Sequence, residues 1–184
     1  MKRNALCLGV VALATITMMT IAGCHGGGPD LAAMGKAMAE AKSYRMTTVA
    51  SGSEVTVEIE CPDKMRTLTK ASGTTSEMVR VGSDTYLKMG EKWMKTPAGG
   101  ASTPVCAAAG TTTTASNTAA SPDVTKGEST TINGVACQQW TIGAAGASTT
   151  YCISADNYPV QMKTSAATIT YSDWNKVKIT PPAI

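Results

Sequence analysis

The stretch Glu54-Val55-Thr56-Val57-Glu58-Ile59-Glu60-Cys61 decides the fold, because apolar and polar residues alternate along it without a break. Successive side chains of a β-strand point to opposite faces, so this alternation predicts a strand with one dry face and one wet, acidic face. A sheet that contains such a strand has to bury its apolar face against another layer. The apolar face of this stretch consists of Val55, Val57, Ile59 and Cys61.

Strand patterns recur on both sides of this stretch, separated by Gly, Pro, Asn and Asp residues that favour turns. Asn133-Gly134 is a strong signal for a type I′ hairpin. These patterns predict a mainly β protein of the α+β class with an antiparallel sheet of about eleven strands. The expected strands are 44–51, 54–61, 64–70, 77–81, 85–89 and 92–96, then a strand that begins near Gly127, and 137–142, 148–153, 158–164, 167–171 and 176–180.

One helix and one irregular segment interrupt the strand patterns. Asp30 is a suitable N-cap for a helix, and the apolar residues after it recur at helical spacing as Leu31, Met34, Met38 and Ala41. Residues 97–128 form a low-complexity Ala/Thr/Gly/Ser insert. Two interpretations of the insert stay open. It is either a long solvated loop with a short helix at 105–109, or a lid over the mouth of a cavity.

The N-terminal segment resembles a bacterial lipoprotein signal that ends in a lipobox. Lys2 and Arg3 precede an uncharged stretch, which closes with Ile21-Ala22-Gly23-Cys24. The resemblance implies cleavage before Cys24 and a diacylglycerol on the Cys24 sulfur. The alternative is a membrane anchor, although a run of about 17 residues lies at the lower limit for spanning a bilayer. The expected organisation is a signal at 1–23, a tether at 24–29 and one domain at 30–184 that includes the insert 97–128.

Composition and charge restrict the function classes. The chain has 184 residues and a net charge of +3, which falls to +1 once the signal and its two basic residues are removed. A nearly neutral domain lacks the basic surface that a nucleic-acid partner requires. The chain has 11 Met and no Phe. Methionine is flexible and polarizable, so it suits either a surface for variable apolar shapes or the filling of gaps in a core.

Four cysteines remain for the mature domain after Cys7 leaves with the signal and Cys24 receives the lipid. An even number in an exported chain favours disulfides. A hairpin that turns at Ala144 and Ala145 would place Cys137 directly opposite Cys152, and Cys61 would then pair with Cys106 by elimination. Zinc is not expected, because the cysteines show no C-x₂-C spacing.

The residues needed for catalysis are scarce. The single histidine, His25, lies beside Cys24 in a glycine-rich tether, so it cannot be part of a Ser-His-Asp or Cys-His arrangement in a rigid domain. No phosphate-binding loop is present. We expect neither an enzyme nor a cofactor or metal site.

The order of elements and several short motifs resemble the LolA/LolB and LppX/LprG group of envelope proteins. The resemblance implies a strongly curved, incomplete antiparallel β-barrel whose open side is covered by helices, with a cavity for acyl chains between sheet and helices. The motifs are Pro62-Asp63-Lys64-Met65-Arg66, Val81-Gly82-Ser83-Asp84-Thr85-Tyr86 before Lys92-Trp93, Ser154-Ala155-Asp156-Asn157-Tyr158-Pro159, and Tyr171-Ser172-Asp173-Trp174-Asn175-Lys176-Val177-Lys178-Ile179. The candidate cavity residues are Leu31, Met34, Met38, Val55, Val57, Ile59, Leu87, Met89, Trp93 and Trp140.

The sequence therefore predicts a lipid-anchored envelope protein that binds lipid or the acyl chains of lipoproteins, for carriage or for reception at a membrane, with an envelope protein as a possible partner. The alternative is a non-enzymatic interaction or sensing module on the same fold, with a collapsed core. By resemblance to lipoproteins of two-membrane bacteria, His25 after Cys24 implies the outer membrane. With a single membrane, the anchor would hold the domain at its outer face.

Overall fold

The computed structural model describes residues 28–96, 105–106, 123–143 and 148–184. Within these ranges it has one helix and eleven strands. The helix is α1 (Leu31–Glu40), and the strands before the insert are β1 (Ser43–Ala50), β2 (Ser53–Glu60), β3 (Lys64–Ala71), β4 (Thr74–Val81), β5 (Asp84–Met89) and β6 (Lys92–Thr96). The strands after it are β7 (Val124–Ile132), β8 (Val135–Ile142), β9 (Thr149–Ser154), β10 (Pro159–Lys163) and β11 (Thr168–Ser172).

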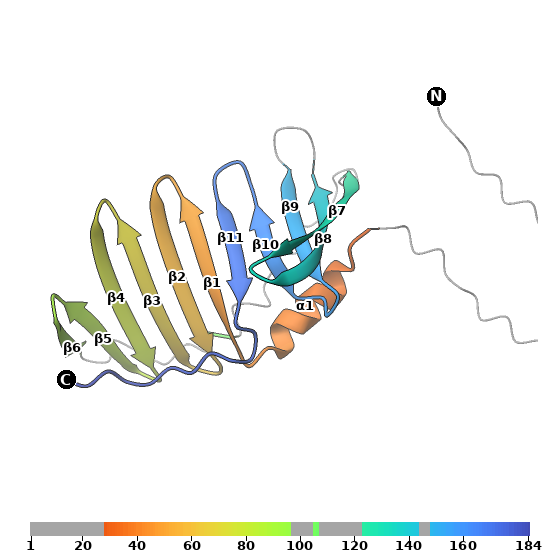
Figure 1. Ribbon diagram of the computed structural model, residues 1–184. Coiled ribbons are helices and arrows are strands. Elements are labelled where there is room, and N and C mark those ends of the chain that lie inside the picture. The colour runs from red at the N-terminus through yellow and green to blue at the C-terminus, as the bar shows by residue number, and fades with distance from the viewer. Residues whose placement is uncertain (1–27, 97–104, 107–122, 144–147) are drawn as a thin grey trace, which may run out of the picture.

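All eleven strands form a single antiparallel sheet in the order β6-β5-β4-β3-β2-β1-β11-β10-β9-β8-β7. Each half is a meander, and the two halves join in the middle where β1 pairs with β11 (Figure 1). Because β6 and β7 are the two ends of the order and do not pair with each other, the sheet stays open. The predicted fold class, a mainly β incomplete barrel, is confirmed.

Tight turns with left-handed backbone set the register of the hairpins. Asn133 and Gly134 have φ values of 50° and 81° between Ile132 and Val135, which pair with each other. Two such residues match the twist of the flanking strands, as in a type I′ turn. The hairpin predicted at Asn133-Gly134 is confirmed.

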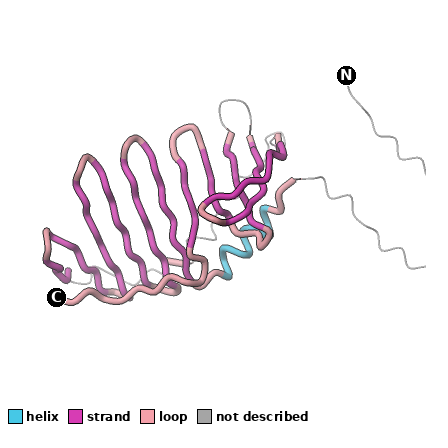
Figure 2. The backbone as a smooth tube through the Cα atoms, in the orientation of Figure 1, coloured by secondary structure: helices cyan, strands magenta, loops and turns pink. Residues whose placement is uncertain are grey.

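The helix α1 begins where the sequence predicts. The Asp30 carboxylate accepts a hydrogen bond from the Ala33 backbone N–H at 2.8 Å, which caps the first turn. The helix is a short segment at one end of the β7–β11 half of the sheet (Figure 2). None of its residues is buried, and Leu31 is 44% exposed. The helix alone therefore leaves most of the sheet uncovered.

The predicted strand at 176–180 is wrong. After β11 the chain turns at Asp173 and Asn175, where φ is 54° and 60°, and then runs without strand pairing across the ends of the strands (Figure 1). Val177 and Ile179 are buried there against Val79. Val177 and Ile179 are alternate residues on the buried side of this C-terminal segment. Its sequence therefore has the periodicity of a strand, although the segment pairs with no strand.

The insert is shorter than predicted, because β7 starts at Val124 rather than near Gly127. Gly127 instead lies in a bulge of β7, where an added Cβ would lie 3.1 Å from the Gln139 Cβ. Residues 1–27, most of the insert and 144–147 lie outside the described residues. The lipobox, Cys24, the lid interpretation and most of the expected helix at 105–109 therefore stay predictions.

Candidate functional site

The pairing register divides the strand residues between two faces, because directly opposite residues share a face. Val57 lies opposite Met46 of β1 and Thr67 of β3, and Thr67 lies opposite Met78 of β4. We call the face that contains Val57 the apolar face. Its large apolar residues are Tyr44, Met46, Val55, Val57, Ile59, Met65, Met78, Leu87, Met89, Met94, Val124, Trp140, Ile142, Tyr151, Ile153, Met162, Ile169 and Tyr171.

The apolar face is incompletely covered by the described part of the chain. Tyr44 and Ile59 are buried at one end of it, whereas Met46, Val57 and Met78 are half-buried. Toward the β6 edge, Met89 is 61% and Met94 is 50% exposed. A sheet face this rich in methionine and aliphatic side chains offers an adaptable apolar surface.

Most of the predicted cavity residues meet on this face. Val55, Val57 and Ile59 lie side by side on β2, and Leu87 and Met89 follow on β5. Trp140 of β8 lies on the same face in the other half of the sheet, opposite Tyr151. Met34 and Met38 are half-buried on α1.

Two predicted cavity residues differ from this placement: Leu31 of α1 is 44% exposed, and Trp93 does not lie on the apolar face, so its predicted position is wrong. The two-residue turn at Gly90-Glu91 pairs Met89 with Lys92, so Leu87 lies opposite Met94 and Trp93 lies opposite Lys88. Trp93 therefore points to the other face, where it packs against Val79 and Tyr86.

An aromatic cluster closes one end of the apolar face, and the sequence analysis did not identify it. The Trp174 ring stacks on Tyr158 with centroids 4.5 Å apart, and it also contacts Tyr44 at 5.0 Å and Tyr171 at 5.9 Å. Burial raises the pKa of the Tyr44 and Tyr171 hydroxyls. A hollow of about 450 Å³ borders the cluster, and Ile132 and Val135 of the β7–β8 hairpin contribute to its wall.

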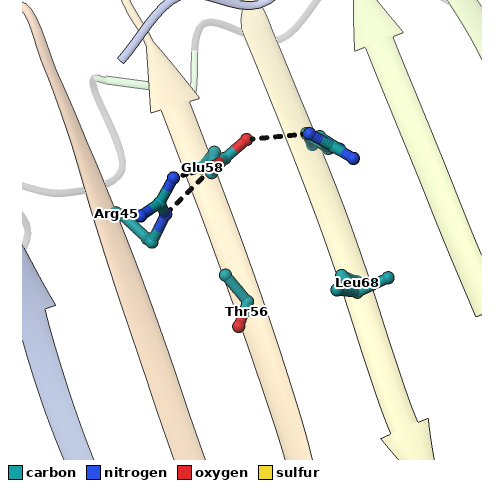
Figure 3. Close-up of a pocket in the computed structure, with 5 residues that line it drawn as sticks. Arg45, Thr56, Glu58 and Leu68 are labelled. Carbon is teal, nitrogen blue, oxygen red and sulfur yellow. Dashed lines mark hydrogen bonds and ion pairs between the residues drawn. The ribbon is translucent and has the colours of Figure 1, made fainter. Parts of the chain in front are cut away.

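The opposite face, which we call the charged face, is built around Glu58. Its carboxylate accepts hydrogen bonds from Arg45 Nε at 3.0 Å and Nη2 at 2.7 Å, and Arg66 Nη1 lies 3.6 Å away. Figure 3 shows this arrangement in a pocket of about 270 Å³ that Thr56 and Leu68 also line. The hydrogen bond to Glu58 is the main cause of the raised pKa of Arg45.

The ion pairs continue outward from this pocket. Arg45 also pairs with Asp173, and Arg66 pairs with Glu77, whose second oxygen lies 3.5 Å from Lys88 Nζ. Because acid and base alternate, each guanidinium already has a carboxylate partner. The pocket in Figure 3 is therefore an internally neutralised network that stabilises the sheet surface.

Glu60, also on the charged face, holds the C-terminal segment. Its carboxylate accepts a 2.7 Å hydrogen bond from the Ile179 backbone N–H, and Lys64 and Lys178 lie at 3.3 and 3.4 Å. The bond from Ile179 is the largest cause of a lowered Glu60 pKa, because it favours the charged carboxylate.

Both predicted disulfides are present. Cys61 and Cys106 join with Cα atoms 5.7 Å apart, and Cys137 and Cys152 with Cα atoms 5.4 Å apart. The predicted register of the second pair is wrong by two residues, because Cys137 lies opposite Ser154 and Cys152 opposite Gln139. The two cysteines are diagonal neighbours on one face, which is still within bonding distance.

Two negative findings apply to the described ranges. No group of three or more His, Cys, Asp or Glu residues there could hold a metal ion. No helix there is long and apolar enough to cross a membrane.

The similarities of this protein to known proteins are similarities of structure. No protein-family model and no curated protein matches the sequence. LprF from Mycobacterium bovis matches with a TM-score of 0.56 and 14% identity, over 85% of this chain and 99% of LprF. A chain of the Pseudomonas aeruginosa MucA/MucB complex matches with a TM-score of 0.42 and 14% identity, over 83% of this chain and 57% of that one. The LolA superfamily protein NE2245 from Nitrosomonas europaea matches with a TM-score of 0.28 and 9% identity, over 82% of this chain and 94% of its own.

The match to LprF covers 85% of this chain and 99% of LprF, so it includes most of the eleven-stranded sheet. At this identity, the match establishes the fold. The chain therefore has a fold similar to that of LprF.

Proposed function

We propose that this protein is a non-enzymatic, lipid-anchored protein of the bacterial envelope that binds the acyl chains of a lipid or lipoprotein on its apolar face. The observation that supports this function is the run of half-buried and exposed apolar side chains along that face from β6 to β8. The resemblance to the lipid-carrying group and the LprF-like fold point the same way.

Burial of hydrocarbon supplies the binding energy. Each methylene transferred from water to an apolar surface contributes about 0.8 kcal/mol. Methionines at Met46, Met65 and Met78 line the central strands of the face, and their flexible side chains can follow acyl chains of different shape. An acyl chain can thus leave a membrane without exposure to water.

The anchor and location belong to the same proposal. A diacylglycerol on Cys24 would hold the domain at a membrane through the short tether that ends at Pro29. Such a domain reaches lipids and lipoproteins in that membrane, which suits reception or local transfer. An envelope protein partner would supply or accept the ligand.

The test measures noncovalent lipid on the full-length protein purified from cell envelopes in mild detergent. Native mass spectrometry separates bound lipid, which denaturation removes, from the covalent lipid on Cys24. We expect about one ligand molecule per chain. The double variant Met78→Gln/Leu87→Gln, which changes two directly opposite residues of the apolar face, should lose most of it.

The matched control is Leu68→Gln, a half-buried leucine on the charged face that also lines the pocket in Figure 3. It should keep the bound lipid at the wild-type level. Absence of noncovalent lipid on the wild-type protein would overturn the proposal and favour the interaction module. Equal loss in both variants would show that the apolar face is not the binding surface.

A further inference from the structure

One row of side chains crosses the apolar face from the edge strand β6 to β11, perpendicular to the strands (Figure 1). Each member lies directly opposite the next in the strand register, so neighbouring Cβ atoms are about 5 Å apart. We call this the central row, and all of its members except the threonine have large apolar side chains. From β6 to β11 it consists of Met94, Leu87, Met78, Thr67, Val57, Met46 and Tyr171.

The rows on either side offer less apolar surface to a ligand over the same strands. On one side, the hydroxyl residues Ser76, Thr69 and Thr48 occupy β4, β3 and β1. On the other side, Tyr44 and Ile59 are buried in the core. A hydrocarbon chain therefore keeps apolar contacts over the greatest length when it lies across the strands, along the central row.

The two ends of the central row differ in burial. At the β11 end, Tyr171 and Val57 pack against the buried core at that end of the sheet, and the Trp174 ring stacks on Tyr171. The row stops there, because the pairing of β11 with β10 ends at Thr170. At the other end, Met94 is 50% exposed on an edge strand. The row therefore has one end closed by aromatic rings and one end open to water.

The length of the central row suits one acyl chain. Neighbouring strands lie about 4.8 Å apart, so a row that crosses the strands from β6 to β11 measures about 29 Å along the sheet. The hydrocarbon core of a bilayer, which is two acyl chains thick, measures about 30 Å. One extended acyl chain of a membrane lipid therefore fits lengthwise on the row.

From these observations we infer that the acyl chain lies along the central row, across the strands, with its terminal methyl at the aromatic cluster and its polar end at β6. This inference rests on the proposed function and specifies how the ligand is oriented. The methyl end has no polar group, so it suits the closed end. The ester and headgroup lose hydrogen bonds to water when they are buried, so they belong at the open end.

The experiment compares two probes that differ only in the position of the photoactivatable group. Full-length protein purified from cell envelopes is reconstituted in phosphatidylcholine vesicles. These contain a trace of phosphatidylethanolamine whose palmitoyl chain carries a diazirine either near its terminal methyl or near its ester. After irradiation, peptide mapping locates the cross-links of each probe on the strands.

The measured quantity is the ratio of cross-links on β1 and β11 to cross-links on β5 and β6. This ratio should be at least about fivefold higher for the methyl-end probe than for the ester-end probe, because a reversed chain would bring its ester to the closed end. Comparison of the two ratios cancels differences in yield between the peptides.

The variant Met46→Trp tests the row itself, since Met46 lies directly opposite Tyr171. The larger side chain fills the space beside Tyr171, so methyl-end cross-links on β11 should fall about fivefold. The matched control is Thr48→Trp, which changes the next residue of β1 on the same face. Thr48 is also half-buried but lies outside the central row, so this variant should keep the wild-type pattern.

The outcomes separate this inference from the proposed function. Apolar-face cross-links with equal ratios for the two probes, or with the reverse order, would overturn the orientation and leave acyl binding intact. Equal effects of Met46→Trp and Thr48→Trp would overturn the assignment to the central row. The comparison of the two probes on the wild-type protein depends on neither variant. Absence of cross-links on the strands would overturn the proposed function and, with it, this inference.

Discussion

Glu60 shows how one side chain can hold a segment that forms no strand. Its carboxylate is the acceptor for the Ile179 backbone N–H and has two lysines beside it. We expect Glu60→Gln to lower the free energy of unfolding at pH 7 by about 1.5 kcal/mol, because a hydrogen bond to a charged acceptor is replaced by one to a neutral amide. Urea unfolding monitored by tryptophan fluorescence measures this change. Glu54→Gln, which affects only an exposed pair with Lys70, should cost less than about 0.5 kcal/mol.

The same residue makes part of the stability depend on pH. The pKa of Glu60 is lower in the folded protein than the usual glutamate value of about 4.3, so its stabilising effect is present at neutral pH and is lost as the pH falls through the folded-state pKa. The difference in unfolding free energy between wild type and Glu60→Gln should therefore shrink as the pH falls below the usual glutamate pKa of about 4.3. A difference that stays constant as the medium is acidified would contradict the role assigned to the carboxylate.

Trp174 is the residue on which the aromatic cluster depends. Its ring contacts Tyr44, Tyr158 and Tyr171, which come from three separate parts of the chain. We expect Trp174→Ala to reduce the free energy of unfolding by about 3 kcal/mol, and Trp174→Phe to recover at least half of this loss by keeping a stacked ring. Thermal unfolding followed by circular dichroism compares the two variants. Equal stability of Trp174→Ala and wild type would refute this role.

At the scale of elements, the disulfides differ in what they connect. Cys137–Cys152 staples the neighbouring strands β8 and β9, whereas Cys61–Cys106 attaches the insert to the end of β2 across a sequence separation of 45 residues. In the chain-entropy model, loss of the first costs about 3 kcal/mol and loss of the second about 4 kcal/mol. Paired Cys→Ala variants, compared by denaturant unfolding, should rank in that order. The reverse ranking would mean that the insert is tied down by other contacts.

The helix and strands also show how much of the fold could be predicted from the sequence. Period-two alternation fixed the central strands, and Asn133-Gly134 fixed a hairpin, because both signals depend only on neighbouring residues. The C-terminal segment was predicted wrongly, because Val177 and Ile179 alternate as in a strand. They are instead buried against Val79 and Tyr86, and a long-range hydrogen bond joins the Ile179 backbone N–H to Glu60. Trp93 could have been placed correctly, because a two-residue turn at Gly90-Glu91 already puts Leu87 opposite Met94.

The site was harder to predict than the strands. Val55, Val57 and Ile59 were identified from one strand, but the aromatic cluster and the basic residues of the apolar face depend on registers between distant strands. Lys126, for example, shares a face with Trp140 only because of the bulge at Gly127. No local sequence pattern predicted this bulge.

For the whole molecule, the order of the strands predicts a gradient of stability. β1 pairs along its full length with β2 and over Arg45–Val49 with β11, whereas β6 and β7 have one partner strand each. Native-state hydrogen exchange should find the slowest amides in β1, β2 and β11 and the fastest strand amides in β6 and β7. Protection that is uniform across the sheet would indicate that the edges are covered in solution.

The pairing of β1 with β11 has a consequence for how the protein is made. β1 is the first strand to be synthesised, but its partner β11 is the last, because residues near position 45 pair with residues near position 172. Until the ribosome has released almost the whole polypeptide, two unjoined half-sheets are all that can form. Any copy that stops short of Thr168 leaves β1 without one of its two partner strands.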